Sequence, residues 1–330
     1  MPVSRREFLA ATVASGALLP GIAAAADASN KTKNFEGIFP IVQTPFAESG
    51  ALDTETLAGE VEFLHRIGVQ GMTWPVNASE YLQLTLDERL AGTETILRAR
   101  QKSDPAKRLP VVIGVQAAEI ETAVKLAKHA EKNGADAIIA IPVNAGKADD
   151  ARQMEYYSAI AGATARPLFV QAIGDVSVDL VLRMAKKNPA IRYVKDEAGN
   201  TSARLAEYRK KEQILTGIFT GKHGPTFLDD LARGATGNMP ASGFGELYVA
   251  VWQAWKSGRE DVAEDMFAKT LVMVSHAQNY GVAGQKYMLQ LRGVFKNSIC
   301  RRDAGGQVFD ADAKKAIERS MAYVKPWLKG

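Results

Sequence analysis

The stretch from Ile191 to Asn200 reads Ile-Arg-Tyr-Val-Lys-Asp-Glu-Ala-Gly-Asn and places Lys195 at the end of a short β-rich run. Acidic residues and a glycine follow at once and turn the chain. A lysine at the carboxyl end of a barrel strand faces the mouth of the barrel. Strand walls would remove water from its ammonium and favour the neutral amine, which can attack a carbonyl carbon and form a Schiff base. The alternative is a solvated lysine paired with Asp196 or Glu197.

Short β-rich runs alternate with helical patterns from residue 36 onward, which favours a parallel sheet with helical crossovers. The helical patterns end at glycine. One example is the apolar series Leu57, Val61 and Leu64, which is followed by Gly68. The runs predicted as strands are Gly37–Gln43, Gly71–Pro75, Pro110–Val115, Ala137–Pro142, Pro167–Ala172, Ile191–Lys195, Ile214–Thr220 and Thr236–Pro240. These eight units predict an α/β fold, a (β/α)8 TIM barrel spanning residues 36–243.

The main alternative fold is a doubly wound open sheet, which would need a glycine-rich phosphate loop after its first strand. The turn at that position reads Thr44-Pro45-Phe46-Ala47-Glu48, so the barrel is preferred. Residues 244–328 read as helix throughout and predict a C-terminal helical region of about three or four helices. We interpret its aromatic and methionine residues as core or subunit contacts.

Composition narrows the classes of function. The 330 residues are 46% hydrophobic, enough for a large core, and 41 basic against 37 acidic residues form no basic block. Nucleic acid is therefore not an expected partner. The single cysteine, Cys300, excludes an internal disulfide and a multi-cysteine metal site. The four histidines have no metal-ligand spacing and are expected on the surface or in packing, so no metal or organic cofactor is predicted.

The N-terminal residues have the pattern of a targeting segment. Twin arginines, Arg5 and Arg6, precede the apolar run Phe8–Leu19, and the tract Ala23–Ala26 offers cleavage sites. Residues 1–26 are therefore predicted to be a twin-arginine signal peptide that delivers the folded protein to the periplasm. A membrane anchor is the alternative, but the run has 12 residues, and a bilayer span needs about 20. No stable membrane anchor is expected.

Several motifs in order resemble the N-acetylneuraminate lyase and dihydrodipicolinate synthase family of Schiff-base aldolases. They are Thr44-Pro45-Phe46, Glu80 followed by Leu84–Arg89, Gly134-Ala135-Asp136 before Ile141-Pro142, and Val194–Asn200. The resemblance covers about Gly37 to Arg302 and implies a barrel in which Lys195 is the nucleophile. It also implies a 2-oxo acid substrate, such as pyruvate or a sugar-derived 2-keto acid, and a homo-oligomer, a tetramer or dimer.

The carboxylate-binding turn of this family is altered in the chain. Where the family usually carries Gly-Thr-Thr-Gly-Glu, the sequence reads Val76-Asn77-Ala78-Ser79-Glu80. Backbone amides, the Asn77 amide and the Ser79 hydroxyl can still bind a carboxylate, so Asn77, Ala78 and Ser79 are candidate substrate-binding residues. The alternative is ordinary turn chemistry. Met239, at the end of the eighth predicted strand, is the fourth candidate.

A larger departure lies on the fifth predicted strand, where the family has a tyrosine that relays protons. Counting from Pro167 places Gln171 at that position. An amide is not a general acid or base at neutral pH, so Gln171 is predicted to orient water or a substrate oxygen. The alternative is a satisfied polar residue at a strand end. No arginine follows where the synthase branch binds its second substrate, which speaks against dihydrodipicolinate synthesis.

Two functions follow from these residues. The first is a periplasmic lyase, of aldolase or dehydratase type, that acts on a 2-oxo acid through a Schiff base on Lys195, with Gln171 in the catalytic site. A protonated imine would stabilise the adjacent carbanion without a metal or cofactor. The second is a barrel that has lost catalysis and binds or senses a small carboxylated ligand.

Overall fold

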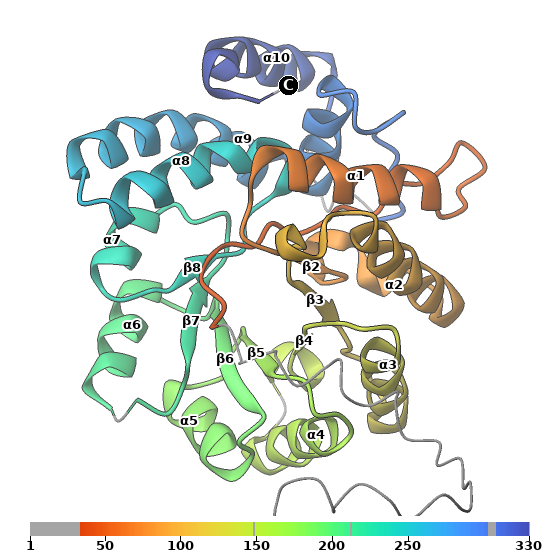
Figure 1. The fold of residues 1–330 in the computed structure, drawn as a ribbon, viewed down its shortest axis with the longest axis vertical. Helices are drawn as coiled ribbons and strands as arrows, with labels where there is room; N and C mark the ends of the chain where they lie inside the picture. The colour runs from red at the N-terminus through yellow and green to blue at the C-terminus, as the bar shows by residue number, and fades with distance from the viewer. Residues whose placement is uncertain (1–33, 148, 212, 303–307, 330) are drawn as a thin grey trace, which may run out of the picture. The chain divides into compact units, whose positions relative to one another are not determined.

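In the computed structural model, which describes residues 34–147, 149–211, 213–302 and 308–329, eight parallel strands form one sheet in the order β1-β8-β7-β6-β5-β4-β3-β2. Figure 1 shows helices arranged around these strands. Single bridges from Ile41, three residues after β1, to Thr73 and to Ala241 join this part of the chain to both of its neighbours. The predicted (β/α)8 barrel is confirmed. The strands are β1 (Gly37–Ile38), β2 (Met72–Trp74), β3 (Val111–Gly114), β4 (Ala137–Ala140), β5 (Leu168–Ala172), β6 (Ile191–Asp196), β7 (Gly217–Thr220) and β8 (Gly237–Asn238).

The helices follow the strands in alternation, as the sequence pattern predicts. Their ends carry the expected caps: the Asp53 carboxylate accepts from Thr56 N before the first helix, which stops at Gly68 in the left-handed region, φ 82°. The helices are α1 (Thr54–Ile67), α2 (Leu86–Gln101), α3 (Ile120–Lys132), α4 (Asp150–Gly162), α5 (Val178–Lys187), α6 (Thr201–Lys210), α7 (Phe227–Ala232), α8 (Gly245–Lys256), α9 (Glu260–Leu291) and α10 (Ala311–Val324).

All eight predicted strands exist, but most are shorter than predicted. The prediction extends the first strand to Gln43, whereas β1 ends at Ile38. Pro40 lies just beyond it and has no N–H to donate to a neighbouring strand, which interrupts the ladder. The chain regains a single bridge at Ile41. Short strands still suffice to bring eight strand ends to one edge of the barrel.

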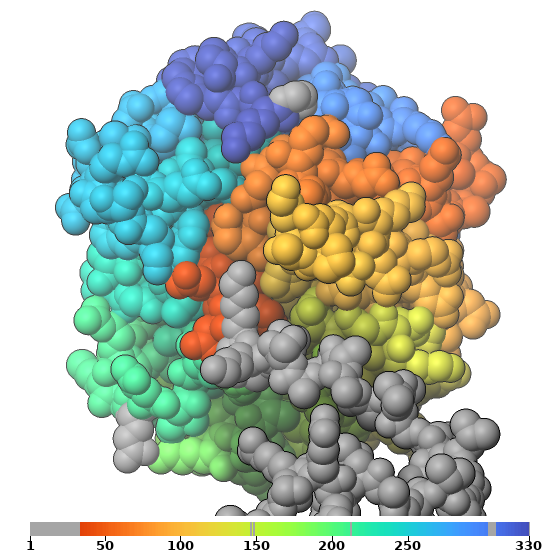
Figure 2. All heavy atoms as spheres, viewed as in Figure 1, coloured from red at the N-terminus to blue at the C-terminus, as the bar shows by residue number. Residues whose placement is uncertain are grey.

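Aromatic side chains fill the barrel interior below the carboxyl ends of β5 and β6. Phe169 and Tyr193 stack at 4.5 Å between ring centroids, and Phe35 packs on Tyr193 at 5.2 Å. Phe35 N also donates to the Tyr193 hydroxyl at 3.2 Å. Figure 2 shows atoms from the start of the described chain, coloured red, at the centre of the face in view. Because side chains alternate along a strand, Gln171 and Lys195 lie directly above this apolar floor.

The C-terminal helices differ in their relation to the barrel. Helix α8 packs against β1 and α1 and completes the ring, although the predicted boundary at residue 243 assigns it to the C-terminal region. Helices α9 and α10 lie beyond that ring and pack on each other (Figure 1). The prediction of about three or four helices agrees with α8, α9 and α10, but the prediction of helix throughout residues 244–328 is wrong, because residues 292–302 form a loop. From Phe35 onward the chain is a single compact unit.

The predicted signal peptide, residues 1–26, lies outside the described residues. Among the residues that are described, no helix combines the length and the apolar character needed to cross a membrane. Export and the periplasmic location stay predictions.

Candidate active site

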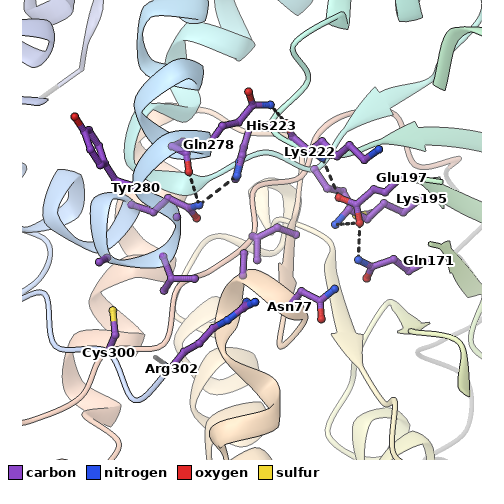
Figure 3. A pocket seen from close by; sticks show the side chains of 18 residues that line it. Asn77, Gln171, Lys195, Glu197, Lys222, His223, Gln278, Tyr280, Cys300 and Arg302 are labelled. Carbon is purple, nitrogen blue, oxygen red and sulfur yellow. Dashed lines mark hydrogen bonds and ion pairs between the residues drawn. The ribbon is translucent and has the colours of Figure 1, made fainter. Parts of the chain in front are cut away.

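A cavity of about 600 Å³ opens at the carboxyl ends of the strands, within the usual range for small-molecule sites (Figure 3). Its walls come from the strand ends, from α9 and from the loop that follows α9. The residues that line it are Ile41, Asn77, Ala78, Gln171, Lys195, Glu197, Lys222, His223, Met239, Ala277, Gln278, Tyr280, Gly281, Val282, Ala283, Gln285, Cys300 and Arg302.

Lys195 stands at the end of β6 with only 3% of its surface exposed. In the sheet it pairs with Gln171 on β5 and Phe219 on β7, so its side chain enters the cavity above the aromatic floor. The alternative from the sequence, a solvated lysine paired with Asp196 or Glu197, is wrong about solvation, although the pairing with Glu197 is present. A buried primary amine facing a cavity is the arrangement that Schiff-base chemistry needs.

Glu197 is the ion-pair partner of this lysine. Its Oε2 lies 3.2 Å from Lys195 Nζ and accepts a hydrogen bond from Gln171 Nε2 at 2.6 Å. Its Oε1 accepts from Lys222 N at 2.9 Å. Burial alone would raise the pKa of Glu197, but the Lys195 ammonium and these hydrogen bonds bring it below its ordinary value. The group is therefore an ionised carboxylate at neutral pH, within proton-transfer distance of the amine.

A glycine leaves room for this carboxylate. A Cβ on Gly221 would lie 2.0 Å from Glu197 Oε1, so any larger residue would displace the carboxylate. Asp196, between Lys195 and Glu197, points the other way: it accepts from Arg204 Nε at 2.8 Å and from the Tyr208 hydroxyl at 2.9 Å on α6. Strand alternation thus fixes which acidic residue serves the cavity and which anchors the strand to its helix.

The structure brings most of the predicted site residues together. Asn77, Ala78, Gln171 and Met239 line the same cavity as Lys195. Gln171 is 1% exposed and its Nε2 is occupied by the carboxylate described above.

Ser79 lies apart from these cavity residues. It is fully buried behind the cavity wall, and its hydroxyl donates to Val42 O at 2.7 Å. The same oxygen accepts from Val76 N at 3.3 Å. Its hydroxyl therefore holds the turn, as the turn-chemistry alternative has it.

Residues from distant parts of the sequence complete the cavity. Gln278 and Gln285 come from α9, which kinks at Gly281, where φ is 54° and glycine is tolerated. His223, expected on the surface or in packing, lines the cavity instead, and burial lowers the pKa of its ring to about 4. Arg302 enters from the loop after α9. Of the cavity residues that the sequence prediction missed, only Glu197 could be located from the local sequence. It follows Lys195 by two residues, so its side chain lies on the same face of the strand.

Within the described residues, no group of three or more His, Cys, Asp or Glu side chains is placed to hold a metal ion. The groups that the cavity offers include the two amines of Lys195 and Lys222, one carboxylate, side-chain amides and the guanidinium of Arg302. This set can hold an oxo acid, form an imine and move a proton.

Comparisons with known proteins agree with this arrangement. The model of the dihydrodipicolinate synthetase family matches residues 34–319. The L-2-keto-3-deoxyarabonate dehydratase of Azospirillum brasilense is 30% identical, covering 81% of this chain and 87% of the relative. An Escherichia coli K12 protein, described as a probable 2-dehydro-3-deoxy-D-pentonate aldolase, is 28% identical, covering 81% and 91%.

A solved structure shows the same fold. It is a prophage protein of the dihydrodipicolinic acid synthase family from Escherichia coli K12 in complex with pyruvate. The TM-score is 0.78 at 24% identity, over 88% of this chain and 99% of that protein. The resemblance inferred from the motifs is thereby confirmed: the chain belongs to the dihydrodipicolinate synthetase family and is a lyase of that family.

Proposed function

We propose that the protein forms a Schiff base between Lys195 and the 2-oxo carbon of a 2-keto-3-deoxy sugar acid, and then eliminates water or cleaves a carbon-carbon bond. The observation that carries the proposal is the buried pair of Lys195 Nζ and Glu197 Oε2, 3.2 Å apart in the cavity. The names of the two relatives, a keto-deoxypentonate dehydratase and a pentonate aldolase, support this substrate class.

Glu197 supplies the acid and base that Gln171 does not. Its carboxylate takes a proton from the Lys195 ammonium, and the free amine adds to the 2-oxo carbon to give a carbinolamine. The protonated Glu197 then returns that proton to the carbinolamine hydroxyl, which leaves as water while the imine forms. Gln171 holds the carboxylate in place through its 2.6 Å hydrogen bond. The imine draws electrons from C3. Glu197, again a carboxylate, can take the C3 proton and pass it to the C4 hydroxyl, which leaves as water, or it can take the proton of the C4 hydroxyl while the C3–C4 bond breaks.

Unpaired acceptors in the cavity favour a hydroxylated substrate. Gln171 Oε1 and Gln285 Oε1 are buried, and neither has a hydrogen-bond partner in the described part of the chain. Buried polar atoms without a partner are costly, so a ligand that donates hydroxyl hydrogens would satisfy them. Sugar acids carry such hydroxyls along the carbon chain.

Borohydride trapping tests the proposal. The mature protein is mixed with 2-keto-3-deoxy-L-arabonate, reduced and measured by intact mass, with Lys195→Ala as the control. A covalent adduct in the wild type alone supports the lyase. Coupled detection of released pyruvate then separates aldol cleavage from dehydration, because only cleavage releases it. Absence of any adduct with 2-keto-3-deoxy acids or pyruvate would contradict Schiff-base chemistry.

A second candidate function, binding or sensing of a carboxylated ligand without turnover, is favoured by Gln171, which does not titrate. Reversible binding without an adduct or product would favour this candidate. For location and assembly, we infer periplasmic export through Arg5 and Arg6 and a homo-oligomer, a dimer or tetramer. The first is supported by the sequence pattern and the second by the family. Fractionation of cells and light scattering of the purified protein test them.

A further inference from the structure

Arg302 brings a cation into the cavity that the proposed chemistry at Lys195 does not use. Figure 3 shows its side chain reaching into the cavity from the Cys300 side, whereas Lys195, Glu197 and Gln171 lie on another wall. The residue is exposed. Among the described residues, only its backbone N has a hydrogen-bond partner, Glu80 Oε1 at 2.7 Å. Its guanidinium therefore presents its donors to the cavity.

The neighbouring Arg301 shows the contrast. Its guanidinium donates to Glu88 Oε2 at 2.8 Å, to Gln83 O at 3.0 Å and to Gly50 O at 2.6 Å. It also lies 4.2 Å from the ring centroid of Phe46. These contacts tie the loop to the barrel. Of two adjacent arginines, one is held by structural contacts and the other is left to the cavity.

The backbone that carries Arg302 is fixed from below. Glu80 Oε1 accepts from the backbone N of both Arg301 and Arg302, at 2.8 and 2.7 Å. The same carboxylate forms an ion pair with Lys286, and both side chains are fully buried. Lys286 Nζ also donates to Ile299 O at 2.8 Å, in the same loop. A buried ion pair thus fixes the backbone position of Arg302. This lowers the conformational entropy that is lost when the guanidinium binds a ligand.

The other titratable groups of the cavity have partners or are neutral. Lys195 is paired with Glu197. The Lys222 ammonium lies 3.4 Å from Gly199 O, the carbonyl of the loop after β6. The His223 ring is neutral at pH 7 because burial lowers its pKa to about 4. The guanidinium of Arg302 adds a positive charge to the cavity on a wall away from Lys195, where the cavity has no carboxylate among the described residues.

We propose that Arg302 binds a second carboxylate of the substrate, at the end remote from the 2-oxo carbon, so that within the class of 2-keto-3-deoxy sugar acids the substrate is a diacid. The inference rests on the proposed function, because the 2-oxo carbon must lie at Lys195. A guanidinium offers two parallel N–H donors that match one carboxylate. The first carboxylate, next to the 2-oxo carbon, binds the turn at Asn77 and Ala78.

The test compares ligands that differ only in the remote carboxylate. Binding of 2-oxoglutarate and 2-oxopentanoate, which share a five-carbon chain, is measured by calorimetry, and 2-oxoadipate and 2-oxohexanoate form a six-carbon pair. The wild type should bind the diacid of at least one pair about tenfold tighter or more, as expected for charge-assisted hydrogen bonds. Arg302→Gln should abolish that preference while changing the Kd of the monoacid less than about twofold. Arg302→Lys, which keeps the charge but loses the fork, should retain part of it.

Arg98→Gln is the matched control, because Arg98 is a highly exposed arginine on α2. It should change none of the dissociation constants. Equal affinity of the wild type for diacid and monoacid in both pairs overturns the proposal. So does an equal loss for both acids in Arg302→Gln, which would assign Arg302 to the first carboxylate, or tighter binding of a 2-keto-3-deoxy acid 6-phosphate than of either diacid.

Trapping with pyruvate and borohydride separates this inference from the function beneath it. Pyruvate has no second carboxylate, so Arg302→Gln should form the adduct on Lys195 as the wild type does. An adduct without a preference for diacids would support the lyase function and contradict the role of Arg302. If the wild type forms no adduct, the proposed lyase function is contradicted, whatever the affinities for the diacids are.

Discussion

Replacing Glu197 by glutamine tests whether its carboxylate moves protons for Lys195. Glutamine has nearly the same shape: its oxygen can accept from Lys222 N, and its NH2 group can donate to Gln171 Oε1 once the Gln171 amide turns over, so the fold should be kept. The carboxylate 3.2 Å from Lys195 Nζ is the only one that lines the cavity within the described residues. No other group there replaces it. General acid-base catalysis contributes about 10²–10⁴-fold, or about 3–5 kcal/mol of barrier, and kcat should fall by that factor.

The assay is single-turnover imine formation, stopped with borohydride at increasing times and followed by intact mass. The pH dependence adds a second readout. Because the pKa of Glu197 is lowered, the wild type should keep its activity into mildly acidic solution and lose it as pH falls through that value. Glu197→Gln should lack this acid limb. Glu155→Gln, at an exposed position on α4, is the control. A rate within about threefold of the wild type, well short of a general acid-base effect, would refute the proton-transfer role.

Three further predictions concern other parts of the chain. Gln171→Tyr should keep the fold because the ring can enter the cavity; a loss of several kcal/mol in denaturant titrations, as in overpacked cores, would show instead a structural role. Changing Arg5 and Arg6 to lysine should leave the precursor in the cytoplasm, and normal arrival in the periplasm would contradict the export assignment. Burial raises the pKa of Glu60 from 4.5 to about 8, so the folded state retains a proton that the unfolded chain releases. The free energy of unfolding should fall as pH rises between those values, by up to about 1.4 kcal/mol per pH unit, and Glu60→Gln should remove this pH dependence. A pH dependence that persists in Glu60→Gln would show that Glu60 is not its source.

The fold was predictable because its signals are local and repeated. Each strand and helix shows its own periodicity, and the stops at glycine, such as Gly68, lie where the sequence pattern puts them. The ends of the strands are harder to predict from the sequence. Strand β1 ends at Ile38 because Pro40 has no N–H to donate, and whether a missing donor ends a strand depends on the neighbouring strand in the folded sheet. The sequence pattern does not distinguish α8, which packs on β1, α1 and α9, from an appended helix, because both kinds of helix have the same periodicity.

The site was predictable only where a motif carries it. Lys195 follows from the strand-end motif, and the inward direction of Glu197 follows from alternation along the chain. Gln285 and Arg302 carry no such signal, because they reach the cavity through the kink in α9 and the loop after it. Ser79 looked like a ligand-binding hydroxyl, yet its nearest acceptor is the carbonyl of Val42, which only the tertiary structure brings close.

The central claim is that Lys195 is the nucleophile, and one measurement tests it most directly. The protein is incubated with pyruvate or a 2-keto-3-deoxy acid, reduced with borohydride, digested and analysed by peptide mass spectrometry, alongside Lys195→Arg, which keeps the charge but forms no imine. One adduct, on Lys195, is expected in the wild type and none in the variant. An adduct on another lysine such as Lys222, or turnover retained by Lys195→Arg, would contradict it.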